Sequence, residues 1–111
     1  MEEKQIKIAE WLGLTQSKNS QMLVRNNISL PIFEDGRYGY PFLYKTDLKF
    51  DSSPNWQFIC LEKIKKELGI SFGSLFLELE KKYSNQNKLI ETKQDILDAI
   101  YNYAVKKSCL L

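Results

Sequence analysis

The chain of 111 residues carries 16 basic and 14 acidic side chains, for a formal net charge of +2, and 43% of its residues are hydrophobic. This length fits one domain over residues 1–111, and no stretch is apolar enough for a membrane span. The small charge gives no reason to expect a polyanionic partner. Because histidine is absent, the commonest general base and metal ligand is missing, and we expect no enzyme activity, metal or cofactor.

Cysteine use indicates the cellular compartment. Cys60 and Cys109 are too few for the disulfide framework of a small secreted domain. The charged start of the chain leads into no apolar segment of the kind found in secretion signals. We therefore expect a protein of the reducing cytoplasm, with no membrane association.

The first predicted helix covers residues 3–12. Ile8, Trp11 and Leu12 recur at helical spacing, and Gly13 suits the C-terminal cap. Residues 15–27, which follow, are polar and rich in Asn, Gln and Ser. We predict an irregular segment there.

An alternative interpretation of the same region is a helix-turn-helix that binds DNA. Residues 13–17 are typical of the turn that precedes a recognition helix. Asn19 argues against it, because that inward position normally holds Val or Ile. In this alternative the side chains that face the DNA groove are Gln16, Ser17, Lys18, Gln21 and Arg25.

The middle of the chain, residues 28–51, concentrates aromatic residues among glycines and prolines, which opposes a helix. Asp35 and Gly36 form a turn signal. Pro41 would confine this segment to a sheet edge or a loop. The alternation that predicts one short strand is formed by Tyr38, Tyr40, Phe42 and Tyr44.

The second helix, predicted over residues 54–68, has the clearest pattern. Ser52 and Ser53 offer an N-cap, Pro54 suits the first helical position, and Gly69 suits the end. Its apolar stripe consists of Trp56, Ile59, Cys60, Ile64 and Leu68.

Residues 70–91 fit two structures. Leu75, Leu77 and Leu79 alternate as in a half-buried strand, whereas Leu75, Leu79 and Tyr83 equally fit one helix face. With 84–87 as a loop and 88–91 as a second strand, we predict a hairpin.

The last predicted helix begins after Thr92, which forms a capping-box pattern with Asp95. Its core stripe consists of Ile96, Leu97, Ile100, Tyr103 and Ala104. Together the elements predict an α+β fold: a small layered domain in which a short antiparallel sheet is packed with two to three helices.

Two sets of side chains are candidates for function. Glu34, Asp35, Asp47 and Lys49 resemble the acid–acid–lysine set with which a nuclease holds Mg²⁺, but the first two also suit an ordinary turn, so this remains a minor alternative.

Arginine and tyrosine beside glycines on a projecting loop are typical of protein interfaces. The predicted partner-binding residues are therefore Arg37, Tyr38, Tyr40, Lys45 and Lys49.

The order of motifs along the chain resembles a known family. The motifs are IAEWLG at 8–13, FDSSPNW at 50–56, LEKI at 61–64 and KQDILDAIY at 93–101. They are similar to those of small phage and prophage proteins with the phage ABA-sandwich domain. The resemblance implies an α+β layered fold and a mobile-element origin, and it supplies no catalytic residues.

We therefore expect a non-enzymatic phage or prophage accessory protein that acts by binding a macromolecule. The expected partner is a host protein or ribonucleoprotein complex, and an anti-defence inhibitor of a CRISPR nuclease would fit this description. The helix-turn-helix regulator is the alternative, with nucleic acid as its partner.

Overall fold

The computed structural model describes residues 2–31 and 41–109, without the side chains of residues 2, 87, 108 and 109. Within these residues the protein is a small α+β domain of four α-helices and a three-stranded antiparallel sheet. The helices are α1 (Glu2–Leu12), α2 (Pro54–Leu68), α3 (Phe72–Lys82) and α4 (Lys93–Cys109). The strands are β1 (Thr15–Gln16), β2 (Met22–Val24) and β3 (Phe42–Tyr44), and two short 3-10 helices are η1 (Lys45–Asp47) and η2 (Asn85–Asn87).

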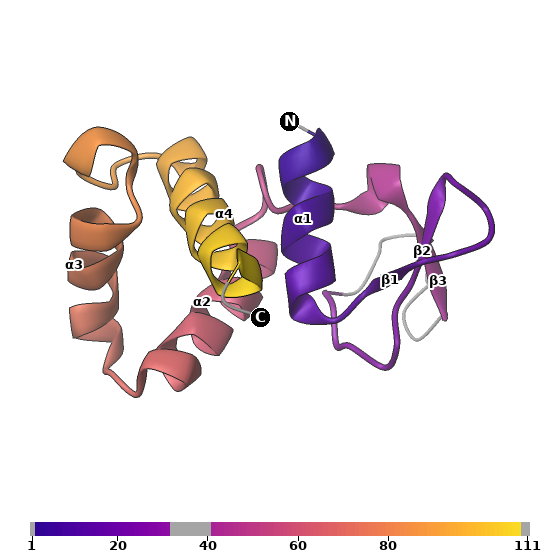
Figure 1. Ribbon diagram of the computed structural model, residues 1–111, viewed down its shortest axis with the longest axis horizontal. Coiled ribbons are helices and arrows are strands. Elements are labelled where there is room, and N and C mark those ends of the chain that lie inside the picture. The colour runs from indigo at the N-terminus through magenta and orange to yellow at the C-terminus, as the bar shows by residue number, and fades with distance from the viewer. Residues whose placement is uncertain (1, 32–40, 110–111) are drawn as a thin grey trace.

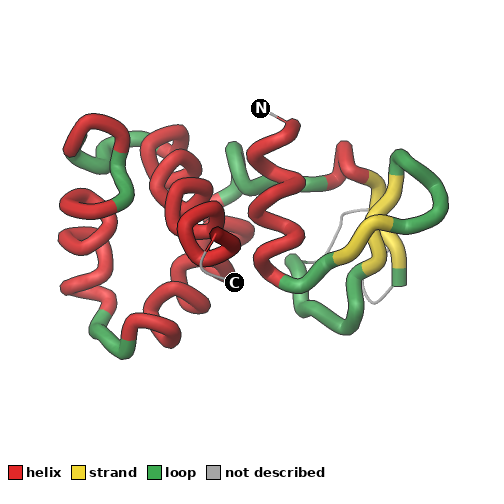
Figure 2. The backbone as a smooth tube through the Cα atoms, in the orientation of Figure 1, coloured by secondary structure: helices red, strands yellow, loops and turns green. Residues whose placement is uncertain are grey.

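Helix α1 lies between the sheet and the other three helices (Figure 1). The sheet occupies one end of the long axis and α3 the other, with α2 and α4 between α3 and α1 (Figure 2). One hydrophobic core connects these parts, because Ile8 of α1, Leu23 of β2 and Ile100 of α4 belong to the same buried cluster. None of the helices in the described ranges has the length and apolar character needed to cross a membrane.

The sheet has the order β1-β2-β3. Leu23 pairs with Leu43, and both side chains are buried in the core. β3 is an edge strand within the described residues, as Pro41 predicted, although Tyr38 and Tyr40 of the predicted strand lie outside these residues.

The prediction of an irregular segment at 15–27 is wrong, and so is the alternative of a recognition helix there. β1 and β2 form a hairpin, with Thr15 opposite Val24 and Gln16 opposite Leu23. The sequence Met22-Leu23-Val24 alternates in burial, which suits a strand with one buried face. After β2, residues 26 and 27 have φ angles of 54° and 64°, a left-handed conformation that asparagine tolerates better than most residues.

Helix α2 confirms the predicted bounds, although the side chain of Ser53 makes no capping hydrogen bond. Ser53 precedes the helix in an extended conformation, Pro54 is its first residue, and Gly69 ends it with a φ of 66°. Trp56, Cys60 and Ile64 are buried, as their spacing indicated.

Gln57 in α2 is a buried polar residue that the apolar pattern did not reveal. Its Nε2 donates hydrogen bonds to the backbone oxygens of Phe50, at 2.8 Å, and Lys93, at 3.0 Å. Because both amide hydrogens have acceptors, the cost of burying the amide group is offset. The side chain also ties the start of α4 to the segment before α2.

The hairpin predicted for residues 70–91 is wrong, because residues 72–82 form helix α3. Ser71 caps this helix by accepting a hydrogen bond from the backbone of Ser74. Leu75 and Leu79 lie on one buried face, whereas Leu77 is 53% exposed. A strand would place all three leucines on the same side. Two buried leucines four residues apart, with an exposed leucine between them, therefore fit a helix and not a strand. No described residue in the range 88–91 belongs to a strand.

Helix α4 confirms the predicted capping box. The backbone of Asp95 donates to Thr92 Oγ1 at 3.1 Å, and the backbone of Thr92 donates to Asp95 Oδ2 at 3.0 Å. This reciprocal pair satisfies donors that a helix start otherwise leaves unpaired. The buried members of the predicted stripe are Leu97, Ile100, Tyr103 and Ala104.

Candidate functional site

The side of the sheet that faces away from the core carries four large apolar side chains, Met22, Val24, Phe42 and Tyr44, which we call the outer sheet face. The strand register places Met22 opposite Tyr44 and Val24 opposite Phe42. Since Leu23 and Leu43 turn into the core, alternation along each strand turns these two pairs outward. Phe42 is 41% exposed and Tyr44 is 46% exposed.

An open groove of about 490 Å³ runs between this face and the loop from β1 to β2. Met22, Val24 and Phe42 supply its apolar part. Residues 16–19 supply the polar side chains that line the rest. The groove thus combines an apolar floor with a polar rim, the pattern that pockets for a specific ligand or partner share.

The rim has a defined shape because the loop makes hydrogen bonds within itself. Ser17 Oγ accepts from the backbone of Asn19 at 3.0 Å and donates to the carbonyl of Asn19 at 2.8 Å. The side-chain oxygen of Asn19 accepts from the backbone of Gln21 at 2.9 Å. Short polar side chains that bond nearby backbone groups are a usual way of fixing turns. The rim is therefore ordered before any partner binds.

Among the described residues that line the groove, Lys18 carries the one formal charge, and none has an acidic side chain. Within the described part of the chain, the Lys18 ammonium makes neither an ion pair nor a hydrogen bond. A cation without an internal partner beside an apolar floor is available for an external carboxylate or phosphate.

Of the predicted partner-binding residues, the two that the structure describes do not line this groove. Arg37, Tyr38 and Tyr40 lie outside the described residues. Lys45 is half-buried at the start of η1, where its backbone donates to Gln21 at 2.9 Å, and Lys49 is exposed. Neither lysine lines the groove.

Sequence reasoning missed Met22, Val24 and the outward direction of Phe42 as parts of one surface. The sequence carries no signal for this surface, because 22–24 and 42–44 are apolar at every position; the alternation appears only in the burial of the two strands. In each triplet the middle leucine is buried and its two neighbours are more exposed.

Of the acidic candidates, Asp47 has a structural role. Asp47 Oδ2 accepts the backbone N–H of Tyr44 at 2.9 Å and so caps η1, and Glu34 and Asp35 lie outside the described residues. Nowhere in the described ranges do three or more metal-ligating His, Cys, Asp or Glu side chains come together.

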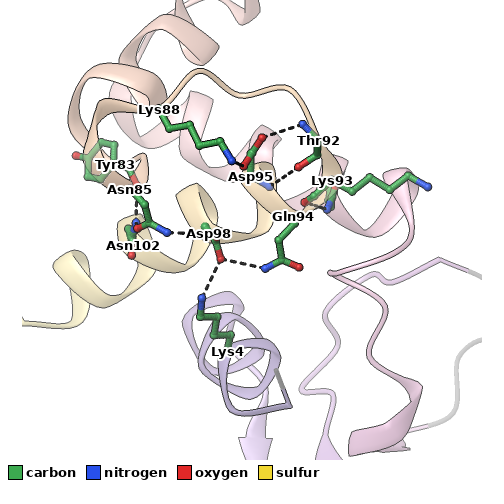
Figure 3. Close-up of polar contacts among 11 residues, drawn as sticks. Lys4, Tyr83, Asn85, Lys88, Thr92, Lys93, Gln94, Asp95, Asp98 and Asn102 are labelled. Atoms are coloured by element: carbon green, nitrogen blue, oxygen red, sulfur yellow. Dashed lines mark hydrogen bonds and ion pairs between the residues drawn. The ribbon is translucent and has the colours of Figure 1, made fainter.

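A second polar cluster joins three elements at the N-terminal half of α4 (Figure 3). Asp98 accepts from Lys4 of α1 at 2.8 Å and from Gln94 at 3.1 Å through one oxygen. Its other oxygen accepts from Asn85 of η2 at 3.3 Å. Because both carboxylate oxygens are already engaged within the protein, we assign this cluster, which borders a pocket of about 250 Å³, to holding the fold together.

A separate aromatic pair is exposed on α2 and α3. Phe58 stacks on Phe72 with ring centroids 5.6 Å apart, and Lys65 lies 5.2 Å from the centroid of Phe72. These rings cover part of each other's surface. Neither ring lines the groove beside the outer sheet face.

Comparison with known proteins gives no match: neither a family model, a curated protein nor a solved structure is significantly similar to this chain.

Proposed function

We propose that this protein is a non-enzymatic binding module that docks a partner protein on its outer sheet face. The observation that carries the proposal is the exposure of Phe42 and Tyr44 beside Met22 and Val24, next to a groove with an ordered rim. Aromatic side chains contribute most of the binding energy in many protein interfaces, and ordered surfaces bind without a large entropic cost.

The test is capture of proteins from a bacterial lysate by three immobilised forms of the chain. These are the wild type, the double variant Phe42→Ser with Tyr44→Ser, and the control Phe76→Ser. Phe76 is 38% exposed on α3, so the control removes a comparable apolar side chain from a different surface. We expect a protein retained by the wild type and the control and lost by the double variant.

Melting temperatures measured on the same three samples separate lost binding from lost folding. Equal capture by the folded double variant would remove the outer sheet face from the interface. Loss of capture by Phe76→Ser alone would move the interface to α3.

We also propose that the partner belongs to a host defence complex, in keeping with the resemblance of the chain's motifs to phage ABA-sandwich proteins. The test is plaque formation by a phage that a CRISPR nuclease restricts, in cells that express this chain. Restored plaquing by the wild type, and none by the double variant, is the expected result. Unchanged restriction by the wild type would contradict this assignment and leave the binding surface to be tested by capture.

A further inference from the structure

We infer that the groove beside the outer sheet face binds an apolar peptide segment of a partner protein that also carries a carboxylate. This inference rests on the proposed function, since it names the chemistry of the partner at the same surface. It follows from the floor of the groove, from the one charge on its rim, and from the state of the rim's other polar atoms.

The floor selects apolar side chains. It consists of a thioether, a branched aliphatic and an aromatic side chain, from Met22, Val24 and Phe42. Methionine adapts its shape to what it contacts, and Phe42 offers a ring that is already 41% exposed. A side chain placed here removes apolar surface from water on both partners, which is favourable in proportion to the area buried.

The rim selects a negative charge. Ser17 Oγ and Asn19 Oδ1 already bond to backbone groups of their own loop. Lys18 lacks such a bond within residues 2–31 and 41–109, and no carboxylate from these ranges lines the groove to neutralise it. A carboxylate beside the apolar floor would form a charge-assisted hydrogen bond with Lys18, partly shielded from solvent.

A protein segment fits this chemistry better than a nucleic acid does. Single-stranded nucleic acids bind to tracks of several basic residues with aromatic rings for the bases. Here the described lining of the groove contains one lysine and one phenylalanine, and the rest of its floor is aliphatic. The net charge of +2 is also small for a phosphate-binding surface.

The experiment selects peptides from a displayed random library on the wild-type chain and discards those that also bind Phe42→Ser. We expect the remaining peptides to combine apolar residues with Asp or Glu. For one such synthetic peptide, Lys18→Met should weaken binding by at least about fivefold, and Lys18→Glu should weaken it further. Lys81→Met is the matched control, because Lys81 is exposed on α3 and does not line the groove, and it should bind as the wild type does.

The outcomes separate this inference from the proposed function. Peptides that require Phe42 but lack acidic residues, or that bind Lys18→Met as well as the wild type, overturn the carboxylate and leave the docking surface intact. If no selected peptide depends on Phe42, both proposals fail. Tight binding of an oligothymidylate probe that Phe42→Ser abolishes would replace the peptide with a nucleic acid.

Discussion

Trp56 anchors the core at the start of α2. Its side chain is 4% exposed, and its ring meets the edge of Phe50 with centroids 5.2 Å apart and planes at 86°. Such a pairing adds to the energy of burial. We predict that Trp56→Ala lowers the free energy of unfolding by about 3–5 kcal/mol, as a large core cavity does.

Urea unfolding followed by circular dichroism measures this change. Phe58→Ala in the same helix is the control, because Phe58 is 48% exposed and its loss should cost clearly less. If the two variants unfold at the same urea concentration, Trp56 is not a core residue.

Asp95 makes the stability of the fold depend on pH. Backbone donation from Glu91 is the largest cause that lowers the pKa of Asp95 from its usual 3.8 to about 2, with Lys88 and Thr92 adding to it. A carboxyl group whose pKa is lower in the folded state stabilises the fold above its unfolded pKa and loses that effect as pH falls through the folded pKa.

We therefore predict that Asp95→Asn lowers the melting temperature at pH 6, and that its difference from the wild type shrinks between about pH 4 and pH 2. Melting curves over this range measure the effect, with Asp51→Asn as a variant outside the capping box. A difference that stays constant down to pH 2 would show that the charge of Asp95 does not support the fold.

At the scale of elements, helix α3 contains a glycine whose replacement by alanine should raise the stability of the protein. Gly73 is the second residue of the helix, and a Cβ there would meet its nearest neighbour, Ser71 Oγ, at 3.8 Å, an ordinary contact. We predict that Gly73→Ala stabilises the protein by about 0.4–1 kcal/mol, because it restricts the unfolded chain without strain.

Gly69→Ala provides a control of opposite sign. Gly69 has a φ of 66°, so alanine there should cost about 1–2 kcal/mol. Thermal unfolding of both variants measures the two effects. A stability loss in Gly73→Ala would contradict the helical assignment of residues 72–82.

The sequence was informative wherever apolar spacing and end signals agreed. For α2, Pro54, Gly69 and a helical stripe all indicate the same element, and Thr92 with Asp95 does so for α4. Residues 72–82 satisfied both periodicities, since Leu75 and Leu79 belong to a strand pattern and to a helix pattern alike. Contacts with α2 and α4 decide between them, and these are not visible in the local sequence.

The groove was harder to predict than the helices, for a related reason. The apolar triplet 22–24 has one buried residue, and a strand that short has no detectable period of its own. It becomes a strand because residues 42–44 pair with it across an intervening stretch of the chain. The sequence suggested a role for Lys18 only in the helix-turn-helix alternative, as a residue that faces DNA. Its place on the rim of the groove depends on the β1–β2 hairpin, which was not predicted.

At the scale of the whole molecule, the sheet and the helices share one core. Leu23 of β2 is fully buried in the same cluster as Ile8 and Ile100. We predict that Leu23→Ala lowers the free energy of unfolding by about 2–5 kcal/mol, and that the helices lose their structure in the same, earlier transition.

Circular dichroism at the helical band, followed against urea, reports on the helices although the substitution lies in the sheet. A helical transition unchanged from the wild type would show that the two parts unfold independently. Met22→Ala is the matched control, because Met22 lies on the outer sheet face and its loss should leave the transition nearly in place.

The buried thiol of Cys60 allows the rate at which the native protein opens to be measured by chemical labelling. The side chain is fully buried, its Sγ donates to the backbone oxygen of Trp56 at 3.7 Å, and desolvation raises the pKa of the thiol far above its usual value. A thiol reagent reacts with the thiolate, so it can modify Cys60 only after α2 has left the core and exposed the side chain. In a Cys109→Ser background, the labelling rate of Cys60 then counts the openings of the native protein in the absence of denaturant. A partner that binds only the folded form should slow that rate in proportion to its occupancy.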